Sequence, residues 1–135
     1  MAAIHRAGTS TAAAVALLAL VGCASGRVSA GPRVTGPGPE RRAIQAALRY
    51  LPAGITCPIV IVDPEAVPDS AAVSRLDAFL VAEPDGSLRQ RVYINRRSPM
   101  LREAMRGTGA YPQMLAAVIV HEGRHLARAP EQHAM

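Results

Sequence analysis

Residues 114–126, Met-Leu-Ala-Ala-Val-Ile-Val-His-Glu-Gly-Arg-His-Leu, constrain the fold of this 135-residue chain more than any other stretch. An unbroken apolar run leads into a pentad in which His121 and His125 are one helical turn apart. Both imidazoles then lie on one side of a helix, about 40° apart around its axis. A core-facing helix rarely carries two histidines and a glutamate without a partner for them. The sequence therefore predicts an apolar helix with a polar site.

That polar site has the spacing of a zinc centre. Two imidazoles one turn apart can both reach one ion at roughly 2.0–2.1 Å. Glu122 lies about 60° from His125 around the helix, close enough to act on a water without binding the metal. Zinc lowers the pKa of water towards about 7, and a carboxylate takes the proton as that water attacks a carbonyl. In the other interpretation, the imidazoles only hydrogen-bond to each other or to backbone carbonyls.

The pentad His-Glu-Gly-Arg-His resembles the motif of the zincin superfamily of zinc metallopeptidases. The resemblance implies that His121 and His125 are zinc ligands, that Glu122 is the general base, and that the substrate is a peptide or protein. The resemblance rests on a specific motif in about the last 25 residues. Over the 70 or so residues before them it rests only on the general architecture.

Zincins have a third protein ligand, and the resemblance implies Glu131 for this role. In one branch, the metzincins, a Gly and then a His or Asp follow the second His at positions that hold Arg128 and Glu131 here. In the other branch, the gluzincins, the ligand is often the first residue of a Glu-x-x-Ala pattern, which Glu131 also begins, at an unusually short spacing. We prefer a short gluzincin-like site, with Pro130 predicted to end the helix and turn the chain. His133 is the competing third ligand.

The N-terminal segment is similar to a bacterial lipoprotein signal. A short basic start precedes an apolar run too short for a permanent membrane span, and the run ends in Leu-Val-Gly-Cys. The resemblance implies cleavage after residues 1–22 and acylation of Cys23, with palmitate-like chains that anchor the protein in the membrane. Residues 23–38 are rich in Gly and Pro and are predicted to be a tether, which leaves 39–135 as the domain. The expected location is the cell envelope, outside the cytoplasm, at the outer membrane if the source has one.

Three strands are predicted in the domain, at 59–62, 78–82 and 91–95. The third alternates polar and apolar residues, so it is expected at an edge of the sheet with one face exposed. In zincins an edge strand runs antiparallel to the substrate above the metal. We therefore predict that substrate pairs with the third strand. The residues of this predicted substrate-binding strand are Val92, Tyr93, Ile94 and Asn95.

The expected fold class is α+β, a minimal zincin-like core with a small three-stranded sheet and an edge strand above the motif helix. The amphipathic helix before the first strand is predicted from Pro39 to Leu51, and another is predicted from Ser98 to Arg106. Cys57 is interpreted as a small buried hydrophobe. Three side chains are open candidates to support a histidine through its second ring nitrogen: Asp63, Asp77 and Tyr93.

Charge and composition exclude one class of partner. The net charge is +5, but every basic residue is an Arg, the arginines are scattered, and only 3% of residues are aromatic. Nucleic-acid binding is therefore not expected. The alternative to a peptidase is a non-catalytic envelope lipoprotein with a structural zinc site or a partner-binding role. That alternative predicts a closed four-ligand site with His133 as the fourth group.

Overall fold

The structure is a computed structural model that describes residues 31–133, with side chains to residue 129. The predicted signal segment and Cys23 lie outside the described residues. The compact unit begins at Pro32. The elements in chain order are β1 (Val34–Thr35), α2 (Gly38–Ala47), a 3₁₀ turn η2 (Leu48–Tyr50), β2 (Ile59–Val62), a 3₁₀ turn η3 (Pro64–Ala66), α3 (Ser70–Val73), β3 (Ala78–Phe79), β4 (Val92–Asn95), α4 (Pro99–Arg106) and α5 (Tyr111–His133).

The strands form one mixed sheet in the order β1-β2-β4-β3. β1, β2 and β4 are parallel, and β3 is antiparallel to β4. The α+β class is confirmed, but the described residues contain four strands rather than three. The additional strand is β1, which lies in the segment predicted to be a tether. Val34 and Thr35 pair with the start of β2, and these ladder hydrogen bonds order a segment that has no apolar periodicity.

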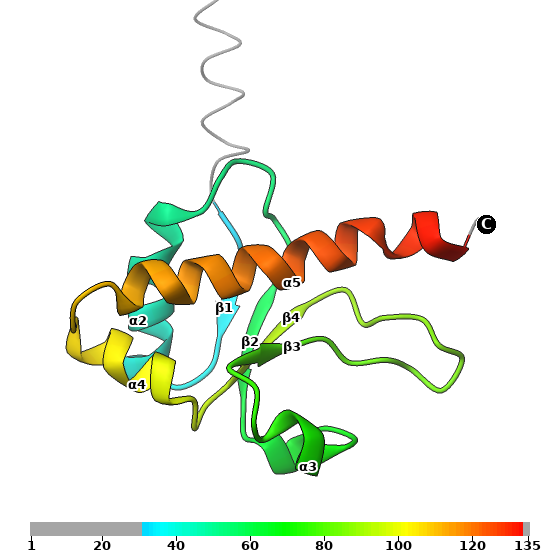
Figure 1. Cartoon of the computed structure of the whole chain (residues 1–135), viewed down its shortest axis with the longest axis horizontal. Helices are drawn as coiled ribbons and strands as arrows, with labels where there is room; N and C mark the ends of the chain where they lie inside the picture. Colours follow the sequence, from blue (N-terminus) through cyan, green and yellow to red (C-terminus); the bar gives the residue numbers. More distant parts are fainter. Residues whose placement is uncertain (1–30, 134–135) are drawn as a thin grey trace, which may run out of the picture. The chain divides into compact units, whose positions relative to one another are not determined.

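Side chains alternate between the two faces of the sheet, and both faces are covered. On one face, Ile59 and Ile61 of β2 pack with Val92 and Ile94 of β4 against α2, α4 and α5. On the other face, Tyr93 packs with Phe79 in a smaller cluster that the η3–α3 segment completes. Figure 1 shows α5 crossing the sheet, with α2 and α4 beside its N-terminal half and α3 at a distance from all three.

The prediction that residues 92–95 form an edge strand is wrong. β4 pairs with β2 on one side and β3 on the other, and its four side chains are all buried. The Tyr93 ring stacks on Phe79 with 5.6 Å between centroids, so the supposedly exposed face is filled. The Asn95 amide nitrogen donates to the carbonyls of Ser74 and Leu76, so this polar side chain is satisfied inside the protein. The strand that ends this side of the sheet is β3.

Local signals in the sequence place α4 correctly. The Ser98 Oγ accepts a hydrogen bond from the Leu101 amide at 3.1 Å, as an N-cap residue does, and Pro99 occupies the first helical position. Gly107 ends the helix at φ 69°, a left-handed conformation that favours glycine. Ser98 also donates to the Asp77 carboxylate at 2.5 Å, which ties the start of α4 to the segment before β3.

The prediction that α5 ends at Pro130 is also wrong, because the helical backbone continues to His133. A proline inside a helix removes one amide donor and the hydrogen bond to the carbonyl four residues earlier. The helix can continue beyond that lost bond, usually with a local bend.

Candidate metal centre

His121 and His125 lie next to each other on α5. Their Nε2 atoms are 3.1 Å apart, and their rings are nearly perpendicular, with 4.6 Å between centroids. Two nitrogen ligands of one tetrahedral zinc ion at 2.0–2.1 Å are about 3.3–3.4 Å apart. The observed separation is slightly shorter than this, and a small change of the ring positions would suit a shared metal. The same separation also suits a ring-to-ring hydrogen bond, so the other interpretation of the pair is equally compatible with this distance.

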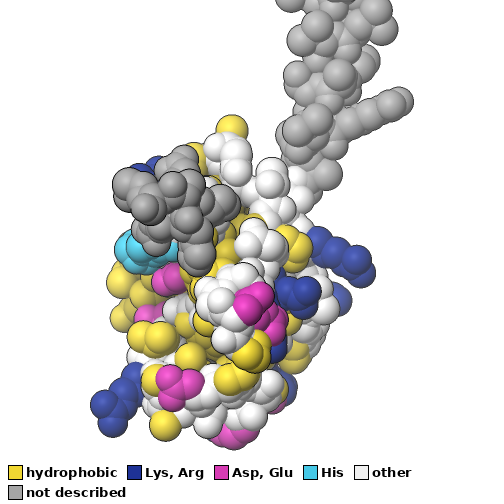
Figure 2. All heavy atoms as spheres, turned by 90° about the vertical axis from the view of Figure 1, so that its right-hand side faces the viewer, with side chains coloured by type: hydrophobic (Ala, Val, Ile, Leu, Met, Phe, Trp, Pro, Cys, Tyr) yellow, Lys and Arg dark blue, Asp and Glu magenta, His cyan; other side chains and the backbone are white. Residues whose placement is uncertain are grey.

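Both histidines are exposed. The buried stripe of α5 consists of Leu115, Ala116, Ile119 and Leu126, and the histidines are on the opposite side. The helix is core-facing as predicted, but its imidazoles face outward. Figure 2 shows histidine side chains in cyan at the surface, close to acidic and hydrophobic side chains.

Glu122 lies at the border between the buried and exposed sides of α5 and is half-buried. Burial raises the pKa of its carboxyl above the usual value, while the charges of His121 and His125 act in the opposite direction. A raised pKa lies closer to neutral pH, and a carboxyl with such a pKa can more readily both accept and donate a proton. Glu122 is therefore a partly buried carboxyl next to the two imidazoles in the sequence, with its protonated form favoured by burial.

A third metal ligand is not found among the described side chains. In this part of the chain no group of three His, Cys, Asp or Glu residues could hold a metal ion. The side chains of Glu131 and His133 lie outside it, so both predictions for the third ligand stay predictions. Helical geometry puts backbone position 131 about 9 Å along the axis and about 120° around it from position 125. Coordination by Glu131 therefore requires the helix to unwind near Pro130.

The three candidates for supporting a histidine have other partners. Asp77 accepts a hydrogen bond from Ser98, and Asp63 lies 3.7 Å from an Arg96 guanidinium nitrogen. The Tyr93 hydroxyl accepts a long hydrogen bond of 3.4 Å from Arg89. Because Asp63 follows β2 directly and Asp77 precedes β3, both carboxylates serve the connections of the sheet.

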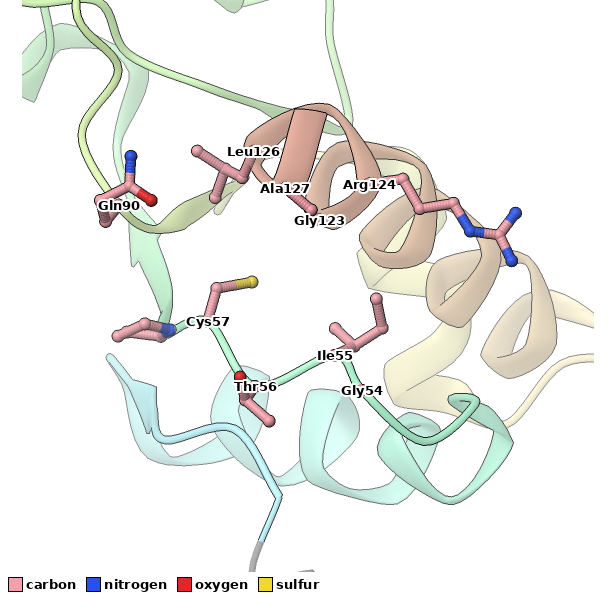
Figure 3. Close-up of a pocket in the computed structure, with 10 residues that line it drawn as sticks. Gly54, Ile55, Thr56, Cys57, Gln90, Gly123, Arg124, Leu126 and Ala127 are labelled. Atoms are coloured by element: carbon pink, nitrogen blue, oxygen red, sulfur yellow. The ribbon is translucent and has the colours of Figure 1, made fainter. Parts of the chain in front are cut away.

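A hollow of about 420 Å³ lies on the opposite flank of α5, between this helix and the 54–58 segment. Figure 3 shows the Cys57 sulfur pointing into the space beneath Gly123, Leu126 and Ala127, with the Arg124 side chain directed away. Burial raises the pKa of the Cys57 thiol, so it stays protonated and unreactive near neutral pH. Cys57 packs against the hydrophobic core as predicted, but it is only partly buried. Ile55 lies near Gly123, at a distance that would place an added Cβ in ordinary contact with its side chain.

A second hollow, of about 330 Å³, lies directly over the histidines. Its lining adds two residues that the motif analysis did not select as site residues, Arg124 and Arg128. Their positions three and seven residues after His121 place them on the same helical face, which is the signal that would have identified them.

No family model, curated protein or solved structure matches the chain. The helices of the described range, residues 31–133, include none long and apolar enough to cross a bilayer.

Proposed function

We propose that this protein is a membrane-anchored, zinc-dependent metallopeptidase that hydrolyses peptide bonds outside the cytoplasm. The observation that supports it best is the 3.1 Å separation of the His121 and His125 Nε2 atoms, with Glu122 beside them. Two imidazole nitrogens and an adjacent carboxyl are two of the ligands and the base that zinc-assisted hydrolysis needs. The zincin-like core and the lipid anchor at Cys23 are parts of the same proposal.

In this proposal His121 and His125 hold the metal. Glu131 completes the site, or His133 in its place, once α5 unwinds near Pro130. Zinc, when bound, supplies Lewis acidity that polarises a carbonyl and lowers the pKa of water. Because coordination by the last turn is incompatible with a continuous helix, zinc binding should shorten α5 and reduce its helical signal in circular dichroism. Zinc affinity of Glu131→Ala and His133→Ala then identifies the third ligand.

Glu122 moves the protons in this mechanism. Its carboxylate takes a proton from the attacking water, and the resulting carboxylic acid gives that proton to the departing amine. Partial burial raises the pKa of the carboxyl, which favours its protonated form and therefore the first of these transfers. The same side chain therefore serves as base and then as acid.

Substrate alignment is assigned to β3 in place of the 92–95 strand. β3 ends the sheet on the side of β4, is antiparallel to β4, and lies next to α5. A terminal strand can add an extended peptide through backbone hydrogen bonds. With only two residues in β3, any such pairing is short, which predicts weak affinity for the peptide backbone.

The test is peptide hydrolysis by the zinc-loaded full-length chain, compared with Glu122→Gln. The proposal predicts cleavage of a mixed peptide library by the wild type and a loss of at least about 100-fold in kcat for the variant, because general-base catalysis contributes 10²–10⁴-fold. Zinc binding should be kept, since the amide leaves both imidazoles in place. Undiminished cleavage by Glu122→Gln would remove this residue from the mechanism, and no cleavage by the wild type would remove the peptidase assignment.

A further inference from the structure

The exposed face of α5 carries a stripe of two histidines and two arginines, formed by His121, Arg124, His125 and Arg128. The four positions follow the spacing i, i+3, i+4, i+7, which places them on one side of the helix. All four are exposed, and together with Ala117 they line the hollow of about 330 Å³.

The guanidinium groups of this stripe have no acidic partner among the described side chains. Arg89, Arg96, Arg97 and Arg106 each form an ion pair with a nearby carboxylate, whereas Arg124 and Arg128 form none with the side chains that the structure describes. Neither an Asp nor a Glu contributes to the described lining of the hollow. The described lining of this hollow therefore carries two guanidinium charges and no carboxylate, while Glu122 lies outside the lining, at the border of the buried side of α5.

We propose that this stripe makes the site selective for acidic peptides, with Arg124 and Arg128 binding a substrate carboxylate beside the histidines. This inference rests on the proposed peptidase function and names its substrate class. A guanidinium offers two parallel N–H donors that match the two oxygens of a carboxylate, and such charge-assisted hydrogen bonds are stronger than neutral ones. The carboxylate is either an Asp or Glu side chain or the C-terminus of the peptide.

The same arginines oppose binding of a free divalent cation at the histidines, because like charges on one helical face repel each other. A bound substrate carboxylate offsets that repulsion. Zinc and acidic peptide should therefore bind cooperatively, and each should raise the affinity for the other by the same factor. Replacing either arginine by glutamine should tighten zinc binding in the absence of peptide.

The experiment measures peptide binding to the full-length chain, with and without zinc, by fluorescence anisotropy of peptides that carry an uncharged dye. Matched peptides differ in one central residue, Glu or Gln, and each is made with a free or an amidated C-terminus. The variants are Arg124→Gln and Arg128→Gln. Arg75→Gln is the control, because Arg75 is exposed and lies outside the hollow. Its replacement changes the net charge by the same amount as the other two substitutions.

The expected result is binding about three- to tenfold tighter for a peptide with the favoured carboxylate, from exposed charge-assisted contacts. This preference should shrink in both stripe variants and stay in the control. If the central Glu causes the preference, the bound carboxylate is a side chain; if the free C-terminus causes it, the bound carboxylate is the end of the peptide. Equal binding of all four peptides, or an equal loss in Arg75→Gln, would overturn the inference. The measurements without zinc distinguish this inference from the peptidase proposal. If the protein prefers acidic peptides but binds no zinc, the peptidase proposal is contradicted and the peptide selectivity is kept.

Discussion

The Nε2 atoms of His121 and His125 are 3.1 Å apart on an exposed face of α5, while the carboxyl of Glu122 is half-buried beside them. The two imidazoles are thus accessible to a ligand from solution. The carboxyl is withdrawn enough for burial to raise its pKa. The functional proposal is based on this arrangement, in which two exposed imidazoles and a half-buried carboxyl lie within about one helical turn.

Removal of zinc should leave the domain folded. The core of buried apolar residues includes neither histidine, and both imidazoles are exposed, so the metal is not needed to cover any surface. We expect a chelator to lower Tm by only the few degrees that loss of a bound ligand causes. Calorimetry of the zinc-loaded and chelated protein measures this difference. Unfolding on chelation would instead support the structural-zinc alternative.

Glu122→Gln should make the metal-free protein more stable at pH 7. Because burial raises the pKa of this carboxyl in the folded state, the ionised form lowers the free energy of unfolding. The gain from glutamine should diminish as pH falls through the raised pKa and vanish below the ordinary carboxyl value of about 4.3. Urea unfolding of both proteins at pH 7 and pH 4 measures it.

Glu65→Gln is the control variant, for which the change in the free energy of unfolding at pH 7 should have the opposite sign. A backbone hydrogen bond and the Arg97 guanidinium lower the pKa of the Glu65 carboxyl. Its ionised form therefore stabilises the fold above the ordinary carboxyl pKa, and that contribution is lost as pH falls through the lowered value. The variant should be less stable than the wild type at pH 7. Shifts of the same sign in both variants would contradict the electrostatic account.

Asn95→Ala should impair stability rather than substrate affinity. The Asn95 side chain donates to the carbonyls of Ser74 and Leu76 and accepts from the Arg97 amide, and it is 2% exposed. Leaving these groups unpaired should cost about 2–3 kcal/mol in the free energy of unfolding. Urea denaturation measures the loss. A normal unfolding midpoint together with a raised KM would restore the substrate-binding role that the buried position of β4 excludes.

Gly123→Ala should stabilise the protein by about 0.5–1 kcal/mol, the usual advantage of alanine over glycine in a helix. A Cβ at this position would lie 3.4 Å from Ile55 Cδ1 and 3.7 Å from the Cys57 sulfur, which are ordinary contacts. Gly36→Ala is the contrasting variant. Its φ is 147° and an added Cβ would lie 2.7 Å from Ile61 Cβ, so it should destabilise by at least about 1 kcal/mol. Thermal unfolding distinguishes the two, and equal effects would contradict this packing.

Features fixed by neighbouring residues could be predicted from the sequence. Ser98 and Gly107 bound α4 because a cap and a left-handed glycine act within one turn. The β-branched run at 59–62 forms β2 because its apolar side chains suit a strand buried on both faces. The histidine spacing likewise follows from helical geometry alone.

Features fixed by distant residues could not be predicted. Whether β4 lies at an edge depends on β3 pairing beside it, and its second face is filled only because Phe79 stacks on Tyr93. The polar-apolar alternation of residues 91–95 indicated exposure because the internal partners of Asn95 lie about 20 residues away along the chain. Arg124 and Arg128 were overlooked for a different reason, since arginines on a helix usually mark only a solvated face.

Zinc content of the purified full-length chain tests the central claim most directly. Elemental analysis after loading and removal of free metal should give one zinc ion per wild-type chain and one per Glu122→Gln chain. His121→Ala and His125→Ala should each lose the metal, because removing either imidazole leaves too few ligands. Zinc-free wild-type protein, or full occupancy in His121→Ala, would contradict the account.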